Sequence, residues 1–224
     1  MQIGIIGAGQ IGGNLARRLA AVGHSVTIVN SRGPHTLGEL VAETGVTAGA
    51  SAADVVRGAR VVVVTVPLKA VPDLPSDLFA GADDDLVVIE THNYYPRERD
   101  GLIAEIEDGL PESRWVERHL GRPVVKVFNG TYAEDITAGA RPAGAPDRIA
   151  VPVAGDDEAA KRVVRDLVDE IGFDTVDAGG LDDSWRQQPD TPVYGLRGGV
   201  DAVVKALAEA DRERPAAFRA HPAG

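Results

Sequence analysis

Short apolar runs alternate along the chain with segments in which apolar residues recur at the spacing of a helix. The runs predicted to form strands cover residues 1–6, 25–29, 46–49, 59–67, 85–90, 124–128, 149–153 and 173–176. Mostly apolar runs of this length, such as Val61-Val62-Val63-Val64, are typical of parallel strands buried on both faces. The helical spacing follows several of them, at residues 10–22, 37–44, 52–58, 158–171 and 200–209. This alternation predicts an α/β fold with one doubly wound, mostly parallel sheet of about eight strands.

The alternation continues without an internal repeat or a clear linker. We therefore expect a single domain over residues 1–224, in which residues 1–120 bind a cofactor, residues 121–212 form a pocket and residues 213–224 are a tail. Of the 224 residues, 44% are hydrophobic, so the chain can bury a large core. We expect a substrate site to be built from loops at strand ends or with a second subunit.

A glycine-rich turn joins the first predicted strand to the first predicted helix, and it reads Gly7-Ala8-Gly9-Gln10-Ile11-Gly12. Gly7 can form the tight turn, Gly9 leaves the backbone open to a pyrophosphate, and Gly12 lets the helix pack against the strand. The first amides of the helix, at Gln10 and Ile11, would face the phosphates. Together with the second strand, this makes a unit of about thirty residues, the length of a Rossmann-type dinucleotide site.

The end of the second strand indicates which dinucleotide is bound. NAD-selective sites usually have an acidic residue here, which binds the ribose 2′-hydroxyl. This chain has Asn30-Ser31-Arg32 instead. Arg32 can pair with a 2′-phosphate, while Asn30 and Ser31 can donate hydrogen bonds to it. His35, in a helical turn that can begin at Pro34, is a further candidate for binding the cofactor. The sequence therefore favours NADP(H), although Arg32 could also be a solvated loop cation.

Polar and aromatic residues follow the predicted strand at residues 85–90, at an edge where open α/β sheets bind ligands. His92 could donate to an acceptor or carry a proton, or it could cap local backbone groups. Asn93 is a candidate cofactor ligand. The residues expected to line a substrate pocket, from this loop and from two later ones, are His92, Tyr94, Tyr95, Tyr132, Trp185 and Arg186.

Composition narrows the classes of function. The formal net charge of −11 disfavours nucleic acid or an anionic membrane as a partner. No stretch approaches the roughly twenty apolar residues of a membrane span, so we expect a cytoplasmic protein. The absence of cysteine excludes disulfides and thiolate chemistry. The five histidines lack the spacing of metal ligands, so we expect no metal site.

Several motifs, taken in order, resemble one family of reductases. They are the glycine turn, Asn30-Ser31-Arg32, Thr65-Val66-Pro67, Val125-Lys126-Val127-Phe128-Asn129, Pro152-Val153-Ala154-Gly155-Asp156 and Val176-Asp177-Ala178-Gly179. The family is that of the coenzyme F420-dependent NADP oxidoreductases. The cytosolic NADPH-binding domain of the six-transmembrane ferric reductases is similar too. The resemblance covers roughly residues 1–185.

The resemblance implies hydride transfer between NADP(H) and a flavin-like acceptor, with coenzyme F420 as co-substrate, in a homodimer. It also implies that Val66, Pro67, Asn129 and Gly130 lie near the nicotinamide. Two segments depart from the family. This chain has Gly33-Pro34-His35-Thr36 where the archaeal enzymes are more basic, and the residues that would bind the acceptor are not recognisable at 91–95 or 185–189.

Two other functions remain open. One is an NADPH-dependent reductase of a small imine or carbonyl metabolite, and the other is a non-catalytic NADP(H) sensor. Hydride transfer depends mainly on how two rings are held, so no catalytic side chain is strictly required and His92 is only a candidate. An anionic acceptor tail could bind basic side chains near the pocket, namely Lys69, Arg97, Arg99 and Arg186.

Overall fold

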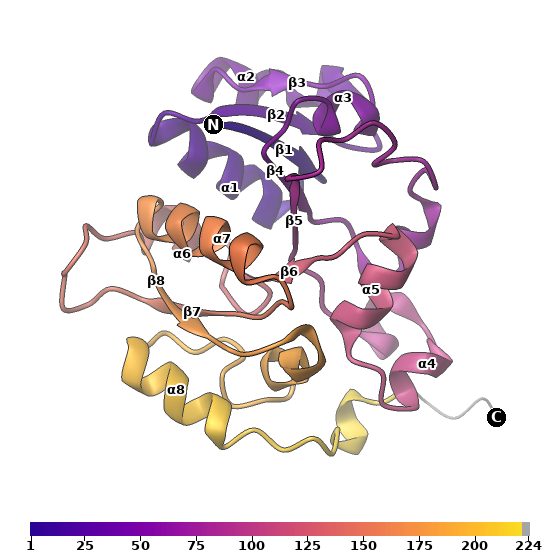
Figure 1. The fold of residues 1–224 in the computed structure, drawn as a ribbon, viewed down its shortest axis with the longest axis vertical. Coiled ribbons are helices and arrows are strands. Elements are labelled where there is room, and N and C mark those ends of the chain that lie inside the picture. The colour runs from indigo at the N-terminus through magenta and orange to yellow at the C-terminus, as the bar shows by residue number, and fades with distance from the viewer. Residues whose placement is uncertain (221–224) are drawn as a thin grey trace.

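The main sheet consists of six parallel strands. A computed structural model describes residues 1–220 of the chain and is shown in Figure 1. The strands, in their order across the sheet, are β3 (Thr47–Ala48), β2 (Ser25–Val29), β1 (Gln2–Ile6), β4 (Val61–Val64), β5 (Val87–Glu90) and β6 (Val125–Lys126). This is the strand order of a dinucleotide-binding fold, so the predicted class of a doubly wound α/β fold is confirmed.

The direction of winding reverses between β1 and β4. β1 pairs in parallel with β2 on one side and with β4 on the other, with Ile6 opposite both Val29 and Val64. In open α/β sheets, ligands bind outside the carboxyl ends of the strands at such a point. The glycine turn follows β1 directly and therefore lies at this position.

The prediction of one sheet of about eight strands is corrected in one respect. The last two strands, β7 (Ala150–Val153) and β8 (Asp174–Asp177), form a separate parallel sheet. An antiparallel bridge between Lys126 and Ala154 connects it to the end of β6. Sequence periodicity identifies strands but does not say which strands pair, so it could not show this division.

Eight α-helices within residues 1–220 cover the two sheets. They are α1 (Gln10–Ala21), α2 (Gly38–Thr44), α3 (Ala52–Val56), α4 (Ala104–Glu107), α5 (Glu112–Leu120), α6 (Asp135–Ala138), α7 (Glu158–Glu170) and α8 (Val200–Ala208). Helical segments of the 3₁₀ or π type occupy Pro34–Leu37, Leu68–Asp73, Pro96–Asp100, Leu181–Gln187 and Ala216–Phe218. The predicted tail at 213–224 is described as far as residue 220, and 221–224 lie outside the described residues. No helix in the described part is long and apolar enough to cross a membrane.

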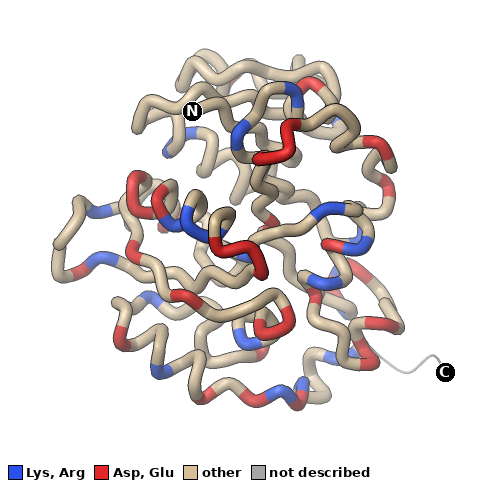
Figure 2. Tube along the Cα trace, viewed as in Figure 1, with Lys and Arg blue, Asp and Glu red and all other residues tan. Residues whose placement is uncertain are grey.

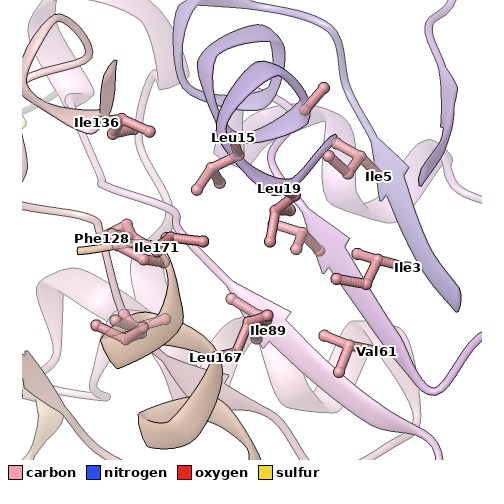
Figure 3. Close-up of a cluster of buried hydrophobic side chains, with 14 of the residues drawn as sticks. Ile3, Ile5, Leu15, Leu19, Val61, Ile89, Phe128, Ile136, Leu167 and Ile171 are labelled. Carbon is pink, nitrogen blue, oxygen red and sulfur yellow. The ribbon is translucent and has the colours of Figure 1, made fainter. Parts of the chain in front are cut away.

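One face of the main sheet is covered by α1 and α7. Figure 3 shows Leu15 and Leu19 of α1 together with Leu167 of α7 around Ile5 and Ile89 of the strands. A second apolar cluster, which includes Val55, Val88 and Val116, brings α3 and α5 to the other face. Because α7 also packs on β7 and β8, it holds the second sheet against the first.

Charged residues of both signs are interspersed along the chain outside the sheet, as Figure 2 shows. Within the six strands of the main sheet, the charged residues are Glu90 and Lys126. Both side chains are completely buried, at the point where β5 and β6 end. A buried charge is costly unless it is paired, so this position requires a specific arrangement of partners.

Candidate active site

The turn after β1 requires glycine at two positions for different reasons. Gly7 has a φ of +112°, a conformation that L-residues rarely adopt, and a Cβ there would lie 2.4 Å from the carbonyl oxygen of Thr65. At Gly12, a Cβ would lie 1.9 Å from the carbonyl oxygen of Gly7. The chain therefore needs Gly7 for the turn and Gly12 for the close approach of α1.

Gly9 differs because, apart from Gly9 itself and its neighbours Ala8 and Gln10, no described atom lies within 4 Å of the position that its Cβ would take. It is the N-cap of α1, and in the described structure no side chain caps this helix and its first turn carries no acidic residue. The amides of the first turn therefore face open space at the positive end of a twelve-residue helix. This geometry suits an anion such as a pyrophosphate.

The loop after β2 is shaped by Asn30. Its side-chain oxygen accepts a hydrogen bond from the amide of Arg32 at 3.0 Å, and its amide group donates to Thr36 Oγ1 at 2.8 Å. Arg32 itself is exposed, and its guanidinium has no ion pair or hydrogen bond within residues 1–220. Asn30 thus shapes the loop, while Arg32 is available to an external anion.

The ends of β5 and β6 are joined by a reciprocal pair of amides. Asn93 donates from Nδ2 to the carbonyl of Asn129 at 2.7 Å, and Asn129 Nδ2 contacts Asn93 Oδ1 at 3.0 Å. The same Asn129 amide donates to the carbonyl of Gln187 at 2.6 Å. The two asparagines, predicted as cofactor ligands, therefore hold the strand ends and the 181–187 segment together.

His92 belongs to a buried ionic network. Its side chain has no exposed surface, and its Nδ1 lies 3.1 Å from Glu90 Oε2. Glu90 Oε1 accepts from Lys126 Nζ at 3.1 Å and from Ser113 Oγ at 2.5 Å. Burial alone would raise the pKa of Glu90, but Lys126 and His92 lower it to about 2. The buried position beside Glu90 favours a structural role for His92, and its role as a proton carrier stays a prediction.

Tyr94 does not line a pocket, contrary to the prediction. It is 1% exposed, and its hydroxyl donates to the carbonyl of Gly101 at 2.9 Å and accepts from the amide of Ile103 at 3.0 Å. Tyr95 points elsewhere, since its hydroxyl contacts that of Tyr194. Burial raises the pKa of both Tyr95 and Tyr194. Tyr94 therefore lies in the core, and Tyr95 remains half-buried.

A small hollow of about 20 Å³, room for about one water molecule, adjoins the end of β6. Its lining includes Asn129 and Gly130, which the sequence predicts to bind the cofactor, Tyr132, which it predicts to line a substrate pocket, and also Gln187. Gln187 was not among the expected pocket residues. Its only signal in the sequence is that it follows Trp185 and Arg186, which is too little to distinguish it from any polar loop residue.

Trp185 and Arg186 lie apart from this hollow. Trp185 lines another depression with Arg212, Arg214 and other residues, and the Arg186 guanidinium pairs with Asp183 at 3.3 Å. Of the other three basic side chains considered as binding an acceptor tail, two already have partners within the protein. Arg97 donates to the carbonyls of Ala216 and Arg219, and Arg99 pairs with Asp100, whereas Lys69 is exposed. The structure therefore does not bring the predicted pocket residues into one cavity.

The geometry of the N-terminal half agrees with a match to a known family. Residues 2–94 match the model of the family described as NADP oxidoreductase coenzyme F420-dependent. This part of the chain is similar to that family. The predicted resemblance and the enzyme class that it implies, an NADP-dependent oxidoreductase, are confirmed at this level. The match includes the glycine turn and the Arg32 loop, and it ends at Tyr94, before the residues of the hollow.

Individual relatives extend the comparison beyond residue 94. A hypothetical protein of Sinorhizobium meliloti is 28% identical with a TM-score of 0.74, over 90% of this chain and 96% of that one. A protein of Arthrobacter sp. FB24, described provisionally as an F420-dependent NADP-reductase, is 26% identical with a TM-score of 0.65, over 81% and 86%. Escherichia coli YjhV is 53% identical over 53 residues, which are 24% of this chain and 39% of YjhV.

The residues of the first half fit an NADP(H) molecule. The space above Gly9 and the uncapped start of α1 can take the pyrophosphate, and Arg32 can take the 2′-phosphate. Val66 and Pro67 lie at the end of β4, the strand next to β1, and Pro67 is exposed. All of these groups lie at the carboxyl edge of one sheet, as a single dinucleotide requires.

Proposed function

We propose that this protein transfers a hydride between NADPH and a flavin-like acceptor, and that the acceptor is coenzyme F420. The proposal that NADPH binds rests on one observation: the N-terminus of α1 has no side-chain cap, and Arg32 on the neighbouring loop is exposed. These two positive groups suit the pyrophosphate and the 2′-phosphate of one molecule. The acceptor part rests on the family of residues 2–94 and on the provisional description of the Arthrobacter relative.

The chemistry of the reaction belongs to the nicotinamide, which supplies a hydride when bound. Overall, NADPH and one proton convert the oxidised acceptor to its two-electron reduced form and NADP⁺. The protein has to hold two rings together and keep water out of the space between them. The Asn93–Asn129 pair supports this role because it fixes the ends of β5 and β6 relative to each other.

The test is NADPH oxidation by the purified protein with oxidised coenzyme F420, with free flavin plus ferric iron, and without acceptor, with NADH as the control nucleotide. We expect turnover with F420 and NADPH, and little with NADH. Saturable NADPH binding without turnover on any of these acceptors would contradict the proposal. That outcome would favour a small imine or carbonyl substrate, or a sensor role.

A further inference from the structure

The end of the described chain, residues 211–220, lies on the surface beside α4, as Figure 1 shows. Every residue of this C-terminal segment is exposed except Arg214 and Ala220, which are partly buried. A depression of about 80 Å³, with room for several water molecules, lies between the C-terminal segment and α4. Parts of a protein with few buried apolar contacts open at a low cost in free energy. The C-terminal segment can therefore leave the surface while the core stays folded.

Arg214 is the side chain that anchors the C-terminal segment in the protein, and it is only 13% exposed. Its Nη2 atom donates to Glu112 Oε1 at 2.5 Å, and its Nε atom lies 4.0 Å from Asp190 Oδ2. The guanidinium carbon lies 5.2 Å from the centre of the Tyr94 ring. Carboxylates and the face of an aromatic ring both attract a guanidinium. This one side chain thus connects the C-terminal segment to α5, to the loop after β5 and to the loop after residues 181–187.

Glu112, at the start of α5, is a buried acid with an incomplete set of partners. Its side chain has no exposed surface, and its Oε2 atom has no hydrogen-bond partner within residues 1–220. The cations that act on it are Lys126, which pairs with Glu90, and Arg214. Burial raises the pKa of Glu112 from 4.5 to about 7, although these two cations oppose the shift. The loss of Arg214 would therefore favour the neutral form of Glu112 further.

The burial of Glu112 comes mainly from elements other than the C-terminal segment. The helix that carries it, α5, packs against α4 and against residues 68–73 and 181–187. Glu112 therefore stays enclosed when the C-terminal segment leaves, but it loses its hydrogen-bonded cation. A carboxyl group that remains buried and loses a cation has a higher pKa. Proton binding by Glu112 and release of the C-terminal segment thus favour each other.

Other titratable groups near this ion pair do not reverse the effect. Burial raises the pKa of Tyr95 and of Tyr194, so both hydroxyls are neutral near pH 7. Burial also raises the pKa of Asp190, although Arg214 opposes the shift, and protonation of Asp190 would likewise weaken the hold on Arg214. The remaining charged side chains on the elements around α5 are exposed or have other partners, namely Lys69, Asp73, Glu105, Glu107, Asp182 and the Asp183–Arg186 pair.

Asp190 has a strained backbone conformation. Its φ is +97°, which residues other than glycine rarely adopt, and its side chain is 7% exposed. Such strain persists only where the surrounding structure enforces it, and it is frequent in switch regions. Further along the same segment, the Tyr194 hydroxyl contacts that of Tyr95 and lies 3.4 Å from Asn93 Nδ2. Departure of Arg214 would remove a contact of the strained residue, in a segment that reaches the loop after β5.

We propose that the C-terminal segment is a latch that Arg214 closes and that protonation of Glu112 opens. When Glu112 is charged, the guanidinium is drawn into its pocket and the C-terminal segment stays docked. When Glu112 is neutral, the ion pair is lost and only weaker contacts hold the segment. Because the docked form binds the proton less tightly than the released form, docking strengthens as the pH rises above about 7. The latch does not depend on which acceptor the protein reduces.

The test is limited proteolysis by trypsin between about pH 6.5 and pH 9, since the C-terminal segment has cleavable bonds after Arg212 and Arg219. A synthetic peptide with the sequence of residues 208–220 is cleaved under the same conditions. Protection is the ratio of the cleavage rate of the peptide to that of the protein, which removes the pH dependence of trypsin itself. Mass spectrometry identifies each cut.

The variant is Glu112→Gln, which stays neutral over the whole pH range. The matched control is Glu117→Gln, because Glu117 lies in the same helix and pairs with Arg114 instead of with the C-terminal segment. The melting temperature of each protein is recorded.

We expect the protection of the wild type to rise at least about fivefold over this pH range, since couplings between linked binding events are typically about 5- to 150-fold. In Glu112→Gln, protection should stay at the low-pH level of the wild type at every pH. Glu117→Gln should follow the wild type. Cuts after Arg212 and Arg219 should precede any cut in residues 1–205, because the core stays folded.

Three results would overturn the inference. In the first, the protection of the wild type is constant or falls as the pH rises. In the second, Glu112→Gln shows the same rise as the wild type, so another group controls docking. In the third, cuts in the C-terminal segment appear together with cuts in residues 1–205, so the segment is released only by global unfolding. The first and third are decided by the wild-type protein alone, even if Glu112→Gln fails to fold.

Discussion

Glu90 and Lys126 lie directly opposite each other in the parallel pairing of β5 and β6, and their side chains form a fully buried ion pair of 3.1 Å. Lys126 also donates to the carbonyl of His92 at 2.9 Å. The pair therefore fixes the register of the short β6 and the path of the loop after β5. Asn93 and Asn129 follow these two strands, so the ion pair helps to hold both asparagines in position.

Replacement of Lys126 by methionine should destabilise the protein strongly. The change leaves Glu90 charged and buried without its cation, which typically costs about 3–5 kcal/mol. Chemical unfolding in urea measures the free energy directly. Lys205→Met is the control, because the Lys205 side chain is 74% exposed and its loss should cost little. A loss below about 1 kcal/mol in Lys126→Met would contradict a supporting role for the pair.

Substitutions at two glycines of the turn should have different effects, one on NADPH binding and the other on stability. Gly9→Ala should not change the melting temperature, because Gly9 has a φ of −78° and there is free space for a Cβ. It should weaken NADPH binding by at least about tenfold, because the added methyl group would lie where the pyrophosphate approaches the backbone. Gly12→Ala should unfold at lower temperature, since its Cβ would meet a backbone oxygen at 1.9 Å. Gly38→Ala, also at an open position, should leave affinity unchanged. If Gly9→Ala and the wild type bound NADPH with equal affinity, the pyrophosphate would not bind at Gly9.

Arg32 should determine the preference for NADPH. Arg32→Gln removes the charge facing the 2′-phosphate, and hydrogen bonds to charged groups contribute about 1.5–3 kcal/mol. We expect NADPH affinity to fall about 10- to 100-fold while NADH affinity stays the same. Arg57→Gln is a matched exposed control, with a side chain 79% exposed. An equal loss for both nucleotides would mean that Arg32 supports the loop and does not recognise the phosphate.

Glu112 should make stability depend on pH. It is fully buried, and burial raises its pKa from 4.5 to about 7, although Lys126 and Arg214 oppose the shift. Because the folded protein holds this proton more tightly than the unfolded chain, stability should fall as pH rises from about 4.5 to 7 and then level off.

Glu112→Gln removes this titration, so the stability of the variant relative to the wild type should increase between pH 5 and pH 8. The shift from 4.5 to about 7 corresponds to about 3 kcal/mol. Thermal unfolding of both proteins across this range measures the difference. Parallel curves would show that the Arg214 contact at 2.5 Å keeps Glu112 charged throughout.

The sequence by itself determined the nucleotide half of the protein. Strand, glycine turn, helix and basic loop are contiguous within residues 1–35, and their roles depend on backbone freedom and local charge, which the order of residues reveals. The alternation of apolar runs likewise identified the doubly wound fold, because burial on both faces leaves a direct pattern in each strand.

The tertiary structure decided how the loops after β5 and β6 are arranged, because that arrangement depends on contacts between residues that are distant in the chain. Glu90 and Lys126 are 36 positions apart, and Asn129 and Gln187 are 58 apart. No local pattern shows that β7 and β8 form their own sheet, that Tyr94 enters the core, or that His92 is buried beside Glu90. Only the folded chain places Gln187 beside the end of β6, where its carbonyl accepts a hydrogen bond from Asn129.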